Sequence, residues 1–211
     1  MDQIENHPLA RRSLVGALLA AGTAGLSSAT GIVRPSQGLA RTPEALARER
    51  LRQHRTPNVE LFDHDGRGVG FYDDVMKGRK VLINVMYSVC SNVCAPATRN
   101  LIEARRLLGD EARDLRFVSM SLTPLSDTPQ VLRAYKKLHG IDASWTFLTG
   151  KPENVERVQR ALGFIGNEPT DDLLSHSAMA RLCDERNLRW SHVNTVLPAR
   201  SIARMIRFEL V

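Results

Sequence analysis

Two cysteines four residues apart are the residues best suited to chemistry in this sequence. They frame the segment Cys90-Ser91-Asn92-Val93-Cys94, between an apolar run and the start of an expected helix. Thiols at this spacing meet on one loop, where they either form a disulfide or ligate one metal ion. A nearby helix N-terminus favours the thiolate, and soft thiolates select Cu(I) and Zn over harder ions. A purely structural pair in an exported domain is the alternative.

A metal site here needs a third ligand, which the six histidines could supply. His176 immediately precedes a strand predicted at 178–183. In a sheet of the expected order this strand lies near the strand at 81–87, which brings the loop before it close to the cysteines. We therefore consider His176 the candidate third ligand. We expect solvated or capping roles for three others: His64 in a turn, His139 at a helix end and His192 in a late hairpin.

The third cysteine has a different setting. Cys183 falls at the end of a predicted strand, where a small apolar side chain suits the core. We expect it to be a buried free thiol without a redox role.

These residues require a framework of alternating strands and helices. An Asp-Gly turn at 65–66 indicates a hairpin over 59–71, and the apolar run 81–87 indicates a strand buried on both faces. The pattern then predicts a helix after Pro96, a strand at 115–122, a helix capped by Asp127 or Thr128, a strand at 145–148, a helix at 152–162, strands at 178–183 and 189–196, and a helix at 199–208. This alternation predicts an α/β fold whose central sheet has helices on both faces.

Composition and charge are those of a globular chain. Of the 211 residues, 43% are hydrophobic and 25% are charged, and the net charge is +6. The basic surplus is scattered, Lys136 and Lys137 included, and lacks the interleaved aromatic residues that base stacking needs. We therefore expect no nucleic-acid partner. A solvated surface and a docking face for an acidic protein both fit.

The N-terminus resembles an export signal. Arg11-Arg12 is followed by the uncharged stretch 13–33 and by small residues before position 40, a pattern similar to a twin-arginine signal. An uncleaved membrane anchor is the alternative. Either interpretation predicts an extracytoplasmic, periplasmic location, and the anchor would also bind the domain to the inner membrane. We divide the chain into a signal or anchor (1–40), a linker with a short helix (41–57) and a folded domain (58–211).

Several segments resemble the SCO/SenC family, in order and at similar spacings over about residues 57–211. They are Asp63–Gly66, Lys77–Lys80, Tyr87–Cys94, Asp127–Tyr135, Phe147–Gly150 and His176-Ser177. The resemblance implies a thioredoxin-like fold, with a central mixed sheet flanked by helices and an added N-terminal β-hairpin. It also implies a copper site of two cysteines and one histidine. Carried over residue by residue, the metal ligands are Cys90, Cys94 and His176, with Cu(I) expected rather than Cu(II).

The resemblance further implies a metallochaperone that delivers copper to the copper-binding subunit of cytochrome c oxidase, or reduces that subunit's thiols. Another cuproprotein, and other thiol or copper carrier proteins, are the further partners we expect. The chain departs from the family pattern in places. Ser91 and Ala95 stand where proline follows each cysteine, and Thr123 and Ser175 stand where acidic residues are usual.

Two functional classes therefore remain open. A copper chaperone performs no reaction and needs His176. A thiol–disulfide oxidoreductase of the cell envelope would instead use Cys90 and Cys94 alone, one thiolate attacking a partner disulfide and the other resolving it. A peroxidase needs one activated cysteine in a different setting and is disfavoured.

Overall fold

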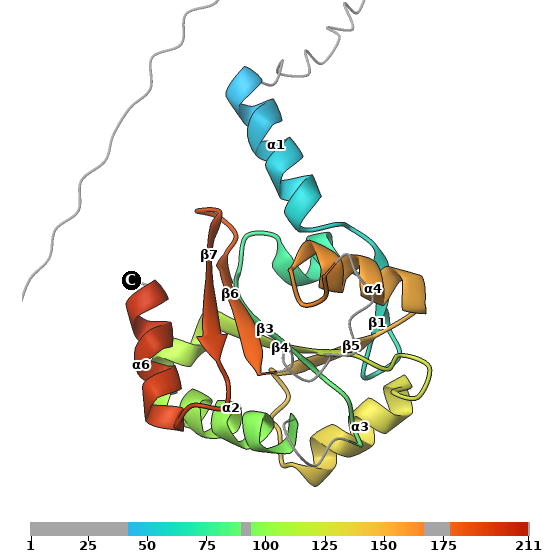
Figure 1. Ribbon diagram of the computed structural model, residues 1–211, viewed down its shortest axis with the longest axis vertical. Coiled ribbons are helices and arrows are strands. Elements are labelled where there is room, and N and C mark those ends of the chain that lie inside the picture. The colour runs from blue at the N-terminus through green and yellow to red at the C-terminus, as the bar shows by residue number, and fades with distance from the viewer. Residues whose placement is uncertain (1–41, 90–93, 167–177, 211) are drawn as a thin grey trace, which may run out of the picture. The chain divides into compact units, whose positions relative to one another are not determined.

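The sheet contains both parallel and antiparallel strands. The computed structural model describes residues 42–89, 94–166 and 178–210. Within these ranges seven strands form one sheet in the order β2-β1-β5-β4-β3-β6-β7 (Figure 1). Their bounds are β1 Glu60–Asp63, β2 Gly68–Gly70, β3 Lys80–Met86, β4 Leu115–Ser121, β5 Thr146–Thr149, β6 Met179–Asp184 and β7 Arg189–Asn194. Strands β3, β4 and β5 are parallel, while β1 pairs antiparallel with β5 and β6 pairs antiparallel with β3.

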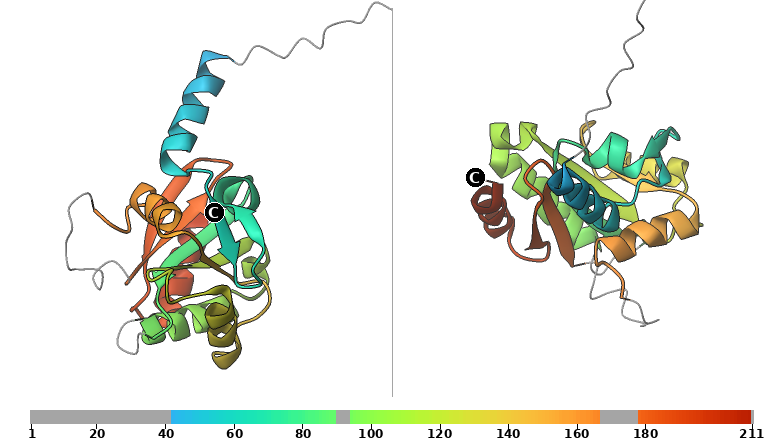
Figure 2. Two further views of the ribbon diagram at one scale, coloured as in Figure 1. Left: turned by 90° about the vertical axis from the view of Figure 1, so that its right-hand side faces the viewer. Right: turned by 90° about the horizontal axis from the view of Figure 1, so that it is seen from above.

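Helices cover both faces of this sheet, as the alternation predicts. One buried cluster joins the sheet to α2, α3 and α6, and a second joins it to α4 and the π-helix η1. The views in Figures 1 and 2 agree with this layering. The helices are α1 Pro43–Arg55, η1 Phe71–Met76, α2 Cys94–Leu108, the 3-10 turn η2 Gly109–Arg113, α3 Pro129–Leu138, α4 Pro152–Ala161 and α6 Ala199–Leu210. The π-helix η1 has no signal in the hydrophobic periodicity.

Strand β3 is central because its side chains contribute to both cores. Leu82 and Met86 belong to the cluster with α2, while Ile83 and Val85 belong to the cluster with η1 and α4. The last two side chains are 0% and 1% exposed. The continuous apolar sequence of this segment therefore reflects burial on both faces, as in other strands of parallel sheets.

The predicted hairpin is formed by β1 and β2. Asp63 Oδ1 accepts the backbone N–H groups of Asp65 at 2.8 Å and Arg67 at 3.0 Å, and Gly66 takes a φ of +81°. This conformation suits glycine, which has no Cβ to clash. Although burial alone would raise the pKa of Asp63, these bonds and the Arg67 guanidinium lower it below its ordinary value.

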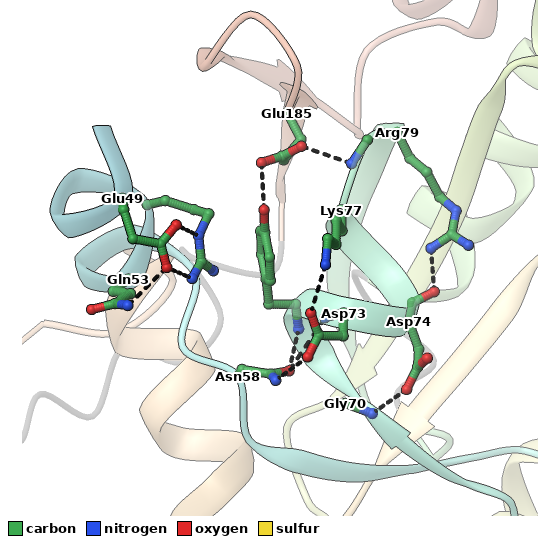
Figure 3. A network of polar contacts seen from close by, with 12 residues as sticks. Glu49, Gln53, Asn58, Gly70, Asp73, Asp74, Lys77, Arg79 and Glu185 are labelled. Carbon is green, nitrogen blue, oxygen red and sulfur yellow. Dashed lines mark hydrogen bonds and ion pairs between the residues drawn. The ribbon is translucent and has the colours of Figure 1, made fainter. Parts of the chain in front are cut away.

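Helix α1 lies in the segment predicted as a linker and packs through its C-terminal half. The Arg52 guanidinium lies 3.6 Å from the centre of the Tyr72 ring. The Tyr72 hydroxyl donates to Glu185 at 2.9 Å, and the Gly78 N–H donates to the same carboxylate at 2.7 Å (Figure 3). Burial, together with this bond to Glu185, raises the pKa of Tyr72 to about 12. These contacts fix α1 to the end of the sheet at which β6 and β7 are joined.

None of the helices in the described ranges is long and apolar enough to cross a membrane.

Candidate metal site

The described part of the predicted site, Cys94, follows the edge of the sheet where its parallel strands end. Strand β3 ends at Met86 and β4 ends opposite it at Ser121. The loops that follow, from Tyr87 and from Leu122, leave this edge together, and the Leu122 N–H donates to the Met86 carbonyl at 2.7 Å. This is the edge at which open α/β sheets bind their ligands. It lies at the opposite end of β3 from the contacts of α1.

Cys94 is the first residue of α2 and is 2% exposed. It belongs to the same buried cluster as Met86 and Leu101. The helix begins three residues before the predicted first position, residue 97, because Pro96 falls within the first turn, where a backbone N–H has no intrahelical partner. This start places Cys94 at the positive end of the helix dipole, which favours a negative charge on its sulfur.

Asp127 binds the two loops of this edge together. The residue is 1% exposed, and its carboxylate accepts four hydrogen bonds. Oδ1 accepts the backbone N–H of Ser88 at 3.2 Å and its hydroxyl at 2.5 Å. Oδ2 accepts the hydroxyls of Ser121 at 2.7 Å and Thr123 at 3.1 Å. Ser88 stands two residues before Cys90, so the described start of the cysteine loop is anchored by a buried carboxylate.

Sequence reasoning missed this role of Asp127. Of the two residues proposed as the helix cap, Thr128 is the cap, because its hydroxyl accepts the N–H of Val131. The sequence does contain a signal for it. Ser88 and Thr123 follow two predicted strands, and Asp127 is the acidic residue nearby that can accept from both hydroxyls.

Two of the three predicted ligands, Cys90 and His176, lie outside the described residues. The described chain on either side of them is informative. Strand β6 pairs antiparallel with β3, with Ala180 opposite Asn84, so β6 enters the sheet at the edge where β3 leaves it. The predicted adjacency of these strands is therefore confirmed. The ligand set itself stays a prediction, and within the described ranges no group of three His, Cys, Asp or Glu side chains could hold a metal ion.

Comparison with known proteins identifies the family. Residues 47–210 match the sequence model of the family described as SCO1/SenC. The chain belongs to the SCO1/SenC family. It is also 30% identical, over 74% of its length and 76% of the relative's, to a protein of Stutzerimonas stutzeri named "Putative copper-binding protein". The resemblance seen in the sequence is therefore confirmed.

Solved structures of SCO1/SenC proteins share this fold. Bradyrhizobium japonicum ScoI, solved with copper bound, aligns with a TM-score of 0.58 and 24% identity over 73% of this chain and 98% of its own. BsSco, described as having a disulfide switch and as belonging to the Sco family of cytochrome c oxidase assembly proteins, aligns with a TM-score of 0.59 and 22% identity over 74% and 92%. The predicted thioredoxin-like α/β fold with an added N-terminal hairpin is confirmed.

One departure from the SCO/SenC pattern now has a structural context. Thr123 stands where the family usually has an acidic residue, and its hydroxyl donates to Asp127. Position 123 therefore supplies a hydroxyl instead of a carboxylate in this protein. The carboxylate present in the loop after β4 belongs to Asp127, and it is buried.

The remaining candidate residues are distributed as follows. Cys183 is 0% exposed in β6, and burial raises the pKa of its thiol, as expected for a core residue. His139 is the C-cap of α3 and His192 is exposed, in agreement with their predicted roles. The expectation for His64 is wrong: this side chain is buried, because α3 and β5 pack over the end of β1.

Proposed function

We propose that this SCO1/SenC protein is an extracytoplasmic metallochaperone that holds Cu(I) with Cys90, Cys94 and His176. Its cargo would pass to the copper-binding subunit of a cytochrome c oxidase. The names of its relatives support this assignment. The Stutzerimonas stutzeri relative is named for copper binding, ScoI was solved with copper, and BsSco is assigned to cytochrome c oxidase assembly.

The observation that carries the proposal is the setting of Cys94. The residue is the first of a helix that follows a central strand in the chain, and the described start of the connection between them is anchored through Ser88. A thiolate at a helix N-terminus in a mostly buried environment is a good ligand for a soft monovalent ion. The export-like N-terminus, Arg11-Arg12 followed by residues 13–33, supports the extracytoplasmic location.

The choice of Cu(I) follows from its coordination chemistry. Two thiolates and one imidazole nitrogen are soft or borderline donors, which suit a d¹⁰ ion with a low coordination number. Zn(II) prefers four ligands and would need a fourth donor at the same edge.

Thiol–disulfide exchange is the second candidate, supported by the disulfide switch described for BsSco. In that function a Cys90 or Cys94 thiolate attacks a disulfide sulfur of the partner to form a mixed disulfide. The other thiolate then displaces the partner's thiol, so the pair is oxidised and the partner is reduced. His176 is not required for this reaction.

A competition titration against a Cu(I) chelator under anaerobic conditions separates the two functions. Replacing His176 with Ala removes one ligand of three, so we expect at least a tenfold loss of Cu(I) affinity, about 1.4 kcal/mol. Cys90→Ser and Cys94→Ser should weaken binding more, because a protonated alcohol is a poor substitute for a thiolate. Disulfide reduction by His176→Ala should stay within a few-fold of the parent.

His192→Ala is the matched control, since this histidine is exposed on β7 and should leave copper affinity unchanged. Unaltered Cu(I) affinity in His176→Ala, together with exchange activity that this variant keeps and the two cysteine variants lose, would favour the oxidoreductase instead.

A further inference from the structure

A histidine and a lysine from distant parts of the sequence meet in the interior, away from the candidate metal site. His64 directly follows β1, Lys136 lies in the last turn of α3, and the two residues are 7% and 8% exposed. The Lys136 Nζ atom lies 3.0 Å from His64 Nε2. Two groups that both gain positive charge on protonation are unusual neighbours in a core.

The hydrogen bonds around this pair fit a state in which both groups are uncharged. The Phe147 backbone N–H donates to His64 Nδ1 at 3.3 Å, so Nδ1 carries a lone pair and the neutral ring carries its proton on Nε2. In this tautomer the Nε2–H points at Lys136 Nζ, and a lysine nitrogen that accepts it is an uncharged amine. The two N–H groups of the amine match two acceptors, the carbonyl oxygens of Trp145 at 2.6 Å and Ala143 at 3.3 Å.

We propose that His64 and Lys136 form a buried pair that is uncharged at neutral pH, takes up one proton on acidification, and thereby loosens the junction between the β1–β2 hairpin and β5. The neutral arrangement uses every donor and acceptor of the pair once, which is the condition for stable burial of polar groups.

Adding one proton breaks this arrangement whichever group takes it. A Lys136 ammonium has three N–H donors and needs the lone pair of His64 Nε2, which moves the imidazole proton to Nδ1. A His64 imidazolium also carries a proton on Nδ1. Both states direct an N–H at the Phe147 N–H, so the backbone bond from Phe147 is lost.

The position of Phe147 connects this event to the hairpin. The last pair of the β1–β5 ladder joins Asp63 and Leu148, and the bond from Phe147 to His64 extends the same seam by one residue. That ladder has only two residue pairs, so loss of the adjoining bond weakens a large part of the junction.

The charged groups around the pair do not neutralise an added proton by direct contact. Asp63 and Asp65 of the hairpin pair with Arg67, Asp142 before β5 pairs with Arg105, and Arg133 of α3 lies against Asp65. Across the described ranges no carboxylate forms an ion pair with Lys136. Burial lowers the pKa of Lys136, and burial together with any charge on Lys136 lowers the pKa of His64, although the nearby carboxylates oppose both shifts.

Nitrogen NMR of the isotope-labelled full chain tests the protonation state directly. At about pH 7.5 we expect Lys136 Nζ to resonate as a neutral amine and His64 to show the Nε2–H tautomer. Lys137, exposed on the next position of α3, supplies the matched ammonium reference, and Lys137→Met should change neither signal. An ammonium signal for Lys136, or an Nδ1–H tautomer for His64, at this pH would overturn the proposal.

Hydrogen exchange tests the consequence in the same unaltered protein. We expect the protection factor of the Phe147 amide to fall at least tenfold between about pH 8 and about pH 5, as its bond to His64 is lost. The amide of Leu82, in the central strand, should keep its protection. Equal protection of Phe147 at both pH values would show that proton uptake does not open this junction.

Discussion

Ser88 and Asp127 connect the loop after β3 to the loop after β4. The Ser88 hydroxyl donates to Asp127 Oδ1 at 2.5 Å, and its backbone N–H donates to the same oxygen at 3.2 Å. Charge-assisted hydrogen bonds of this kind are stronger than neutral ones, and burial strengthens them further. The segment leading to Cys90 is therefore held by the interior of the protein.

Replacing Asp127 with Ala should destabilise the fold by about 2–4 kcal/mol, because three hydroxyls and one backbone N–H lose their shared acceptor. Asp127→Asn should be less damaging, since one amide oxygen remains and hydroxyl groups can rotate to meet the new donor. Urea denaturation measures both changes.

Thr128→Ala is the control for this measurement. It removes the neighbouring helix cap and should reduce stability by only about 1 kcal/mol. If Asp127→Ala is no more destabilising than Thr128→Ala, the network around Asp127 does not hold the two loops.

Most of the framework could be predicted because its signals are local. The continuous apolar run that forms β3, the Asp-Gly turn at Gly66 and the Thr128-Pro129 start of α3 each depend on neighbours in the sequence. The predicted start of α2 lies C-terminal to the observed one at Cys94. Proline is typical of the first position of a helix, so Pro96 indicates a start there although it lies within a helix that has already begun.

The polar interior could not be predicted because it depends on contacts distant in the sequence. His64 and Lys136 are 72 residues apart, and Ser88 and Asp127 are 39 apart. The neighbouring sequence of each of these residues predicts only a turn, surface or capping role. Only the three-dimensional packing brings these partners together and buries His64, Lys136 and Asp127. The candidate ligands Cys90 and His176 rest on the family resemblance for the same reason.

The central position of β3 predicts that Ile83→Asp prevents folding. Ile83 is 0% exposed, and an unpaired buried carboxylate destabilises by several kcal/mol, about the whole stability of a domain. Leu125→Asp makes the same chemical change on a side chain that is 82% exposed and should leave the fold intact. Far-UV circular dichroism and gel filtration check both; a folded, soluble Ile83→Asp protein contradicts the assignment of β3.

Cys183 should not react in the native protein. Its side chain is 0% exposed and burial raises the pKa of its thiol, so very little of the reactive thiolate is present. We expect thiol trapping with mass mapping to label Cys183 only after denaturation, and to show Cys90 and Cys94 interconverting between dithiol and disulfide. A native disulfide that includes Cys183 is the contrary result.

Lys136 should make stability increase with pH above neutrality. Its pKa is lowered in the folded protein, mainly by burial, so the unfolded chain binds more protons between that lowered value and the ordinary value of 10.5. Stability therefore rises with pH across this window and is lost as pH falls through it, with a slope of at most about 1.4 kcal/mol per pH unit. Lys136→Met removes this dependence because methionine does not titrate.

The measurement is the difference in unfolding free energy between the parent and Lys136→Met at several values between about pH 7 and about pH 9. Tyr72 and Cys183 have raised pKa values and contribute the opposite slope at higher pH, but they are present in both proteins and cancel in the difference. We expect the parent to gain stability relative to Lys136→Met as pH rises, while Lys137→Met follows the parent. A difference that is constant over this range would mean that folding does not change the proton affinity of Lys136 there, and the uncharged lysine would have to be abandoned.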